Sequence, residues 1–521
     1  MAREPLNVAA SIIADISAGI YRSPAGALKE LISNAFDADA PSIRISTGWP
    51  KFNTFTCTDD GRGMRPDEFR GIMGHIGGSS KRDAGELSPT FNRPLIGRIG
   101  IGLLSIAQIC RKFTVISSVK GELKKFRADI DLEPYLLAEA RRQLLGQTLQ
   151  TEQGKVKIGE YDIEEAEEAL DKHYTRIVME SIDEGFQKRL TDRPLERAGF
   201  TPKRFTEGRI ADFLRIVEAG TVAEHGAYAQ MVWELAIAAP VQYIDGGPIK
   251  GTHELDDLRE RLAGYHFKAY VDGVELRKPI LLPKKQASAI DRKVYQIRHE
   301  TQLSGSKRLS LRGYLYWQKA RILPRELQGI LVRVRNVAIG QYDPTYLGYP
   351  HHEGWKFSQM TGELYVDEGL DPAVNIDRAS FRESDQAFIE LQGFLFEKLQ
   401  KSGTDEGGGI FTDIKRETGE IRKRARRKAE QRRAKIVSRL AGGPARALPI
   451  EKVEADDAPS GIAFHRGSVR VQEDLIDRVP RKHRELFLAV CRVIEREIES
   501  SICKDKRRKI YEKLADLLSE F

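Results

Sequence analysis

Three polar residues follow one another at helical spacing in the stretch KELISNAFDADA, residues 29–40. At about 100° per residue, Glu30, Asn34 and Asp37 share one face of a helix whose other side is apolar. Ser23 followed by Pro24 predicts where this helix begins. A carboxylate beside an amide can activate water next to a bound cation. For an isolated helix, a solvated face is the simpler explanation.

A second polar group ends the strand-like run FNTFTCTDDGRGM. Asp59 stands at the end of the run, and Gly61, Gly63 and Met64 follow it. Glycines let the backbone approach a flat ligand, while the carboxylate accepts a hydrogen bond from that ligand. Because Asp-Gly also forms turns, this motif indicates a binding site only in combination with others.

The third motif is LIGRIGIGLLSIAQI, in which Gly97, Gly100 and Gly102 lead into an apolar helix. Such an entry exposes unpaired amide N–H groups, to which a phosphate commonly binds. Tight packing is the alternative use of these glycines. The pattern is not a P-loop, because GxxxxGK[ST] is absent from the sequence.

In this order and spacing, the three segments resemble the GHKL ATPase superfamily of gyrase, the ninety-kilodalton heat-shock chaperones, MutL and histidine kinases. The chaperones are closest, since their first motif is similar to YRSPAGALKELISNAFDA. The resemblance implies a Bergerat-fold α/β sandwich that binds ATP and Mg²⁺, with Glu30 as general base and Asn34 as the metal ligand. Asp59 then reads the adenine amino group, and Asp37 either lines the pocket or orients its neighbours. The remaining pocket residues on this resemblance are Gly61, Gly63, Met64, Gly97, Gly100, Ile101 and Gly102.

Other family features lie between and after these motifs. Lys81 in IGGSSK matches a phosphate-contacting lysine, with an ordinary exposed lysine as the alternative. Thr175 in YTRIVMESI matches a threonine that helps to fix the adenine end through water. Residues 65–96 are expected to form the lid over ATP. His75 departs from the family, which has an asparagine near the ribose and the α-phosphate.

A second family segment is GELYVDEGLDPAVNIDRASFRESD. It resembles the part of the chaperone middle domain that reaches the γ-phosphate, and this match makes Arg378 the sensor arginine, in a turn shaped by Asn375. Arginine suits the sensor role because its planar guanidinium group stays charged and can bind phosphate oxygens. A surface salt bridge with Asp377 is the alternative role, and Arg382 is the competing candidate for the sensor.

Charge is concentrated in one segment. The chain has 521 residues and a formal net charge of +8, and Lys415 to Arg439 alone hold twelve Lys or Arg against three Glu. This segment therefore predicts a basic helix for nucleic-acid phosphates, a solvated helix, or a surface for an acidic protein. Aromatic residues do not interleave its arginines, which argues against base stacking.

The sequence predicts an α+β protein of several parts. These are the ATP-binding domain 1–185, a helical connector 186–250, a middle α/β (S5-like) domain 251–401, a flexible break and basic helix 402–445, a linker 446–480 and C-terminal helices 481–521. The four cysteines form no CxxC pair, which predicts reduced structural thiols. With no apolar run long enough for a membrane span, we expect a cytoplasmic location.

Two hypotheses about function follow. In the first, the chain is a shortened chaperone-like ATPase that forms an ATP-gated homodimer and remodels a protein client. In the second, it is a nucleic-acid-associated clamp like MutL or the MORC proteins, which binds through residues 415–439. The final helices, with Leu486, Val490, Ile494 and Ile498 at helical spacing, form a constitutive dimer or pack on their own chain.

Overall fold

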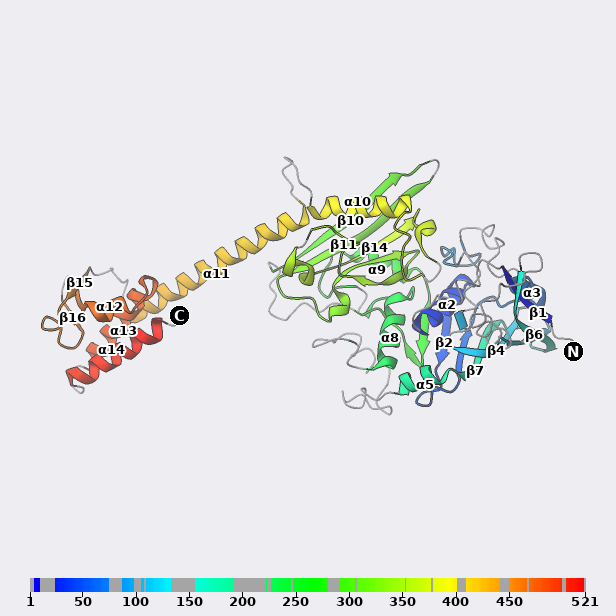
Figure 1. Ribbon diagram of the computed structural model, residues 1–521, viewed down its shortest axis with the longest axis horizontal. Coiled ribbons are helices and arrows are strands. Elements are labelled where there is room, and N and C mark those ends of the chain that lie inside the picture. Colours follow the sequence, from blue (N-terminus) through cyan, green and yellow to red (C-terminus); the bar gives the residue numbers. More distant parts are fainter. Residues whose placement is uncertain are drawn as a thin grey trace, which may run out of the picture. The chain divides into compact units, whose positions relative to one another are not determined.

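The computed structural model of the protein divides into two compact units, Met1–Ile414 and Lys415–Phe521. The residues that it describes are 4–9, 24–74, 87–97, 105–106, 109–132, 155–191, 222, 226–244, 247–279, 291–304, 307–351, 353–375, 378–400, 409–440, 449–465, 468–498 and 503–519. The mixed α+β class predicted from the sequence is confirmed, with one large sheet, two further sheets and C-terminal helices (Figure 1).

The first unit is built on a nine-stranded sheet. Its strands, in spatial order, are β1 (Glu4–Ala9), β6 (Lys155–Glu167), β5 (Lys124–Asp131), β4 (Cys110–Ser118), β7 (Tyr174–Ile182), β3 (Phe55–Asp59), β2 (Ser42–Ser46), β8 (Lys268–Val271) and β9 (Val274–Glu275). Every neighbouring pair is antiparallel except β2 and β8, which run parallel. The strands alternate between a buried and an open face, as the period of two in their sequences requires.

Several helices contribute buried side chains to the core of this unit. They are α2 (Pro24–Asp37), α3 (Pro66–Gly74), α5 (Glu184–Thr191), α8 (Ala227–Ala238) and α9 (Asp256–Ala263). Leu28 and Ile32 of α2 lie in the same core as Ile43, Ile45 and Cys57 of the sheet. Because α2 buries this stripe, its polar face is left at the edge of the core, where the candidate site forms.

The boundary of the first domain differs from the prediction. We expected HFKAYVDGVEL to belong to the middle domain, but β8 and β9 within it extend the first sheet beyond β2. In addition, Asp272 accepts hydrogen bonds from the Thr47 N–H (2.8 Å) and the Tyr228 hydroxyl (2.5 Å). Part of the predicted connector, α8, is buried in this core against α2 and also contacts the second sheet through β13 (Val337–Asp343). A parallel partner reached by a long crossover leaves no local sequence pattern, which is why the boundary was missed.

The second sheet has five strands in the order β10 (Arg292–Gln302), β11 (Arg308–Gln318), β14 (Met360–Glu368), β12 (Gly329–Val334) and β13 (Val337–Asp343). Helix α10 (Gln386–Gln400) follows it, and short 3-10 turns lie at η7 (Arg325–Leu327), η8 (Gly354–Gln359) and η9 (Asp371–Ala373). The β-branched and aromatic residues of RLSLRGYLYW, GILVRVRNVAIG and GELYVD form the strands β11 to β14 of this sheet.

A buried ion pair joins this second sheet to the helical layer. The Arg333 and Glu363 side chains are each only 1% exposed, and the guanidinium of Arg333 also donates to the carbonyl oxygen of Ile237 at the end of α8 (2.6 Å). The Tyr243 hydroxyl donates to the same glutamate at 2.6 Å. The Arg333 guanidinium and the Tyr243 hydroxyl together hold the pKa of Glu363 below its usual value, against the opposing effect of burial. The two layers are therefore fixed to each other close to the site.

The C-terminal unit contradicts the predicted linker over 446–480. Its strands are β15 (Ile450–Val453), β17 (Val469–Gln472) and β16 (Ile462–Phe464), in that spatial order, followed by α12 (Glu473–Asp477) and η10 (Arg481–His483). They enclose a small core with the two predicted helices, α13 (Arg484–Ile498) and α14 (Lys504–Ser519). Strands of three or four residues give too short an alternation to be recognised among charged residues.

The basic helix is confirmed as α11 (Ile410–Leu440), whose side chains from Arg422 to Arg432 are all exposed. Its first turn lies in the first unit, where the Phe411 ring packs against the rings of Tyr349 and Phe357. Within the described part of the chain, no helix combines the length and the apolar character needed to cross a bilayer.

Candidate functional site

The polar face of α2 is where the sequence placed it. Glu30 is buried, with 6% of its surface exposed, and Asn34 and Asp37 are half-buried on the same side. The Oε1 atom of Glu30 is buried and accepts no hydrogen bond among the described residues. Its charged neighbour is Arg378, whose Nε lies 3.6 Å from that oxygen. A buried carboxylate oxygen without a hydrogen-bond donor is suited to accepting a proton from a bound reactant.

Asp37 holds the start of the third motif. Its carboxylate accepts the backbone N–H groups of Ile96 (2.7 Å) and Gly97 (2.6 Å). A Cβ at Gly97 would lie 2.9 Å from Asp37 Oδ2, so a side chain there would press on Asp37, whereas its 3.8 Å distance from Asn34 Oδ1 is an ordinary contact. The structure therefore favours the second of the two predicted uses of Asp37, in which it orients its neighbours.

The second sheet reaches the same segment from the other side. The guanidinium of Arg378 donates to the carbonyl oxygen of Ile96, and that of Arg335 donates to the carbonyl oxygen of Leu95. Arg378 has a φ of +47°, and its carbonyl oxygen accepts a hydrogen bond from Lys29 Nζ at 3.0 Å. The lysine beside Glu30 therefore holds the arginine's turn in place. Residues from α2 and from the second sheet thus fix one backbone segment between them.

The competing arginine points elsewhere. Arg382 is exposed, and its guanidinium donates to the carbonyl oxygen of Pro372 at 3.0 Å. Asn375 shapes the turn as predicted, because its carbonyl oxygen accepts the Arg378 N–H (2.9 Å) and its side chain donates to the Ser380 hydroxyl (2.9 Å). Asp377 lies outside the described residues. The geometry therefore brings Arg378, and not Arg382, to the polar face of α2.

Asp59 ends β3 beside the C-terminal end of α2. Burial raises the pKa of this carboxyl group to about 7, with a further contribution from Asp60, against the opposing effect of the Gly61 N–H, which donates to it at 3.0 Å. Thr175 of β7 is its cross-strand partner. A Cβ at Gly61 would lie 2.8 Å from the carbonyl oxygen of Ala38, so glycine is needed where β3 meets α2.

Gly63 and Met64 pass closely over β4. Gly63 has a φ of +71°, and a Cβ there would lie 1.9 Å from the carbonyl oxygen of Ser118, which excludes every other residue. The Met64 N–H donates to Ser117 Oγ at 2.9 Å, and this hydroxyl lies 3.2 Å from Thr175 Oγ1. Ser117, which the sequence did not single out, therefore ties together two predicted pocket residues.

The predicted lid over 65–96 is too wide. Helix α3 buries Phe69 and Met73 in the core, and near the other end the backbone N–H of Thr90 donates to Asp39 at 2.7 Å. Arg93 anchors the same end through the carbonyl oxygens of residues in α2 and its following turn. Several predicted residues, namely Lys81, Gly100, Ile101 and Gly102, lie outside the described residues, as do residues 75–86.

Comparison with known proteins agrees with this arrangement. Residues 21–153 match the family described as histidine kinase-, DNA gyrase B-, and HSP90-like ATPase. The N-terminal part of the chain is a GHKL-type ATPase domain. A second match is the DNA mismatch repair protein MutL of Anaplasma phagocytophilum (strain HZ), with 32% identity over 117 residues. The matched stretch is 22% of this chain and only 18% of that protein. Closeness of the ATPase domain to the heat-shock chaperones stays a prediction.

The described residues fit a nucleotide with its metal ion. Glu30 offers a buried oxygen without a hydrogen bond among the described residues, and Asn34 carries an uncharged amide oxygen on the same face of α2. Among the described residues, no cluster of three or more acidic, His or Cys side chains forms a ready-made metal cage. Mg²⁺ is commonly held by one or two protein groups together with substrate phosphates.

Proposed function

We propose that this chain is an ATP-hydrolysing clamp that dimerises on nucleotide binding and remodels a protein client, as the ninety-kilodalton heat-shock chaperones do. The GHKL-type ATPase domain supports ATP binding and hydrolysis in general. The observation that carries the finer proposal is the approach of Arg378, next to the second sheet, to Glu30 in α2. Free cysteines, three of which are buried, support a reducing compartment such as the cytoplasm.

Each side chain has a distinct task in this proposal. Glu30 takes the proton from the attacking water, and its burial limits competition from bulk solvent. Asn34 holds Mg²⁺, which when bound offsets the charge of the phosphates. Arg378 stays charged and presents a planar fork to phosphate oxygens. Asp37 binds the backbone N–H groups of Ile96 and Gly97 and so fixes the start of the third glycine motif to α2.

The proposal is tested with the intact chain. Phosphate release from ATP is measured with Mg²⁺ and with excess chelator, and the mass in solution is measured with a non-hydrolysable ATP analogue. We expect turnover only with Mg²⁺ and a doubling of mass with the analogue. Absence of turnover would contradict an enzyme, and a monomeric mass with bound analogue would contradict an ATP-gated dimer.

The raised pKa of Asp59 predicts a pH dependence of nucleotide binding. Below about pH 7 this carboxyl group is increasingly protonated and is a weaker acceptor for the adenine amino group. ADP affinity is therefore expected to rise between pH 6 and pH 8, as measured by calorimetry. The phosphates of ADP also titrate in this range, but they do so equally with wild type and with a variant. Asp59→Asn is therefore the control, and it should bind ADP weakly with an affinity that depends less on pH. An identical pH profile in both proteins would contradict the role of Asp59.

A second function, a nucleic-acid-associated clamp, is favoured by α11. Its exposed basic side chains between Arg422 and Arg432 cover the whole circumference of the helix, and two of them, Lys423 and Arg426, pair with Glu420 and Glu430. A helix that is polar all round needs a partner or solvent on every side. The MutL match adds a relative that is described as a DNA mismatch repair protein.

Charge neutralisation on α11 tests this second function. One variant changes four exposed basic residues of α11 to glutamine, and a matched variant changes four on α14. These are Arg422, Arg424, Arg427 and Lys428 in α11, and Lys504, Lys506, Lys509 and Lys513 in α14. If duplex DNA binds here, the first variant loses roughly 10-fold or more in affinity and has a shallower salt dependence by fluorescence anisotropy. Equal losses in both variants would indicate non-specific attraction, and no binding by wild type leaves the chaperone-like function.

A further inference from the structure

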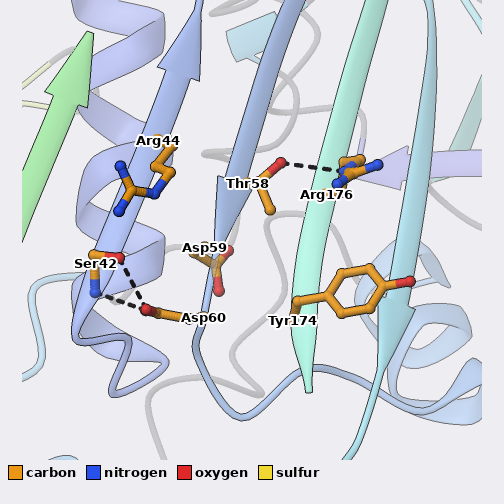
Figure 2. A pocket seen from close by; sticks show the side chains of 7 residues that line it. All are labelled: Ser42, Arg44, Thr58, Asp59, Asp60, Tyr174 and Arg176. Atoms are coloured by element: carbon orange, nitrogen blue, oxygen red, sulfur yellow. Dashed lines mark hydrogen bonds between the residues drawn. The ribbon is translucent and has the colours of Figure 1, made fainter. Parts of the chain in front are cut away.

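The open face of the nine-stranded sheet carries a pocket on the side opposite to α2. The pocket has a volume of about 210 Å³ and is lined by residues of β2, β3 and β7 and the turn after β3, namely Ser42, Arg44, Thr58, Asp59, Asp60, Tyr174 and Arg176 (Figure 2). Strand alternation fixes the face, because Ile43, Ile45, Cys57 and Ile177 point into the core while the residues between them point away from it. The pocket is therefore separate from the polar face of α2.

Two arginines stand on either side of this pocket in one cross-strand row. Arg44 pairs with Thr58 across β2 and β3, and Thr58 pairs with Arg176 across β3 and β7. Arg44 and Arg176 are two strands apart, so their backbones lie about 9.5 Å from each other. Figure 2 shows the two side chains flanking Thr58. Side chains as long as arginine can reach one ligand seated over the threonine from both sides.

Both guanidinium groups are held in position without being neutralised. The Arg44 guanidinium lies over the Tyr270 ring, 4.4 Å from its centroid, and Arg176 Nε donates to Thr58 Oγ1 at 3.3 Å. Within the described ranges, neither forms an ion pair with a carboxylate. Asp60, one of the two acidic residues that line the pocket, accepts the backbone N–H (2.6 Å) and hydroxyl (2.8 Å) of Ser42. Two orientated guanidinium groups without an ion-pair partner among the described residues therefore line the pocket together with the carboxyl groups of Asp59 and Asp60, and each can still bind an anion.

Other basic residues on this sheet have a different environment. Arg127, in the same cross-strand row two strands beyond Arg176, is held by both oxygens of Asp129, at 2.8 and 2.9 Å. Lys112 pairs with Asp131, and Lys124 pairs with Glu165. Among the described residues of this face, these ion pairs interrupt the continuous basic stripe that a polynucleotide needs in order to neutralise several phosphates. The cations at the pocket are Arg44 and Arg176, with Lys268 exposed on the neighbouring strand β8, and this small group suits one compact anion.

We propose that this pocket binds the phosphate group of a small phosphorylated ligand, with Arg44 and Arg176 as its two cationic contacts. An arginine guanidinium can donate two parallel hydrogen bonds to phosphate oxygens. The Thr58 hydroxyl adds a third polar group between the two arginines. The site does not depend on the proposed ATPase function, because it uses none of the residues of the nucleotide site except the border residue Asp59.

Calorimetric titration of the full chain with pyrophosphate tests the site, with saturating ADP present to fill the nucleotide pocket. The variants are Arg44→Gln, Arg176→Gln and, as the matched control, Arg127→Gln, each checked for unchanged thermal unfolding. We expect wild type and Arg127→Gln to bind pyrophosphate, and the two pocket variants to lose about 10- to 100-fold in affinity. Arg176→Lys should recover part of that loss.

Two results would overturn the proposal. One is equal pyrophosphate affinity in all four proteins. The other is binding of a single-stranded oligonucleotide that needs both pocket arginines while pyrophosphate does not bind, which would assign the face to nucleic acid. If ADP itself does not bind, the proposed ATPase function fails, and the same titrations without ADP still compare the four proteins at this pocket.

Discussion

Replacing Glu30 by alanine is expected to lower the rate of ATP hydrolysis by about 10²- to 10⁴-fold while the affinity for ATP changes little. The reason is that Glu30 presents a buried oxygen with no hydrogen-bond donor among the described residues, which a phosphate-bound water can use as a proton acceptor. Single-turnover kinetics and calorimetric ATP binding measure the two quantities separately. A change in kcat without a change in affinity is the signature of a group that acts on the transition state.

Two controls make the Glu30 result specific. Glu184→Ala removes an exposed carboxylate at the start of α5 and should leave both rate and affinity unchanged. Glu30→Gln keeps the shape of the side chain but cannot accept the proton, and it should be as slow as Glu30→Ala. If the glutamine variant retained wild-type turnover, Glu30 would be a structural partner of Arg378 and another group would act as base.

Arg378→Ala is expected to slow hydrolysis by roughly 10²- to 10³-fold, the cost typical of removing one preorganised donor to a developing negative charge. In the structure this guanidinium lies beside Glu30 and donates to the Ile96 carbonyl, so its loss also loosens the glycine segment. The KM for ATP should therefore rise as well. Steady-state kinetics over a range of ATP concentrations give both effects.

Arg382→Ala is the matched control for this second experiment. Arg382 is four residues away and exposed, and its guanidinium donates to the carbonyl oxygen of Pro372 rather than approaching α2. It should keep wild-type kinetics, whereas Arg378→Lys should recover part of the rate because the charge is kept without the planar fork. Equal losses in Arg378→Ala and Arg382→Ala would show that the turn as a whole, rather than one guanidinium, is required.

The local part of the site was predictable from sequence. The shared face of Glu30, Asn34 and Asp37 follows from helix periodicity alone, and the strand that ends in Asp59 follows from its apolar and β-branched run. The glycine at 63 could be recognised as special, and the structure gives the reason in the carbonyl of Ser118. These features depend on neighbours in the chain, which is where sequence patterns are informative.

The parts that were missed depend on distant residues. Ser117 lies in an ordinary strand, and its contact with Met64 exists only because β4 and β7 are neighbours. Arg335 lies in a hairpin turn of the second sheet and meets Leu95 across 240 positions of sequence. Such contacts carry no periodic pattern, and the same limitation produced the wrong boundary at β8 and the wrong linker in the C-terminal unit.

The parallel pairing of β2 with β8 has a consequence for how the protein can be made. In this pair Ile43 lies opposite Ala269. The nine-stranded sheet therefore cannot be completed during synthesis until the residues up to 275, the end of β9, have been translated. A fragment truncated at residue 185 or 250 would present the bare edge of β2, a template on which other chains can add as strands. Such fragments should aggregate, and the shortest independently expressible ATPase unit extends at least through β9.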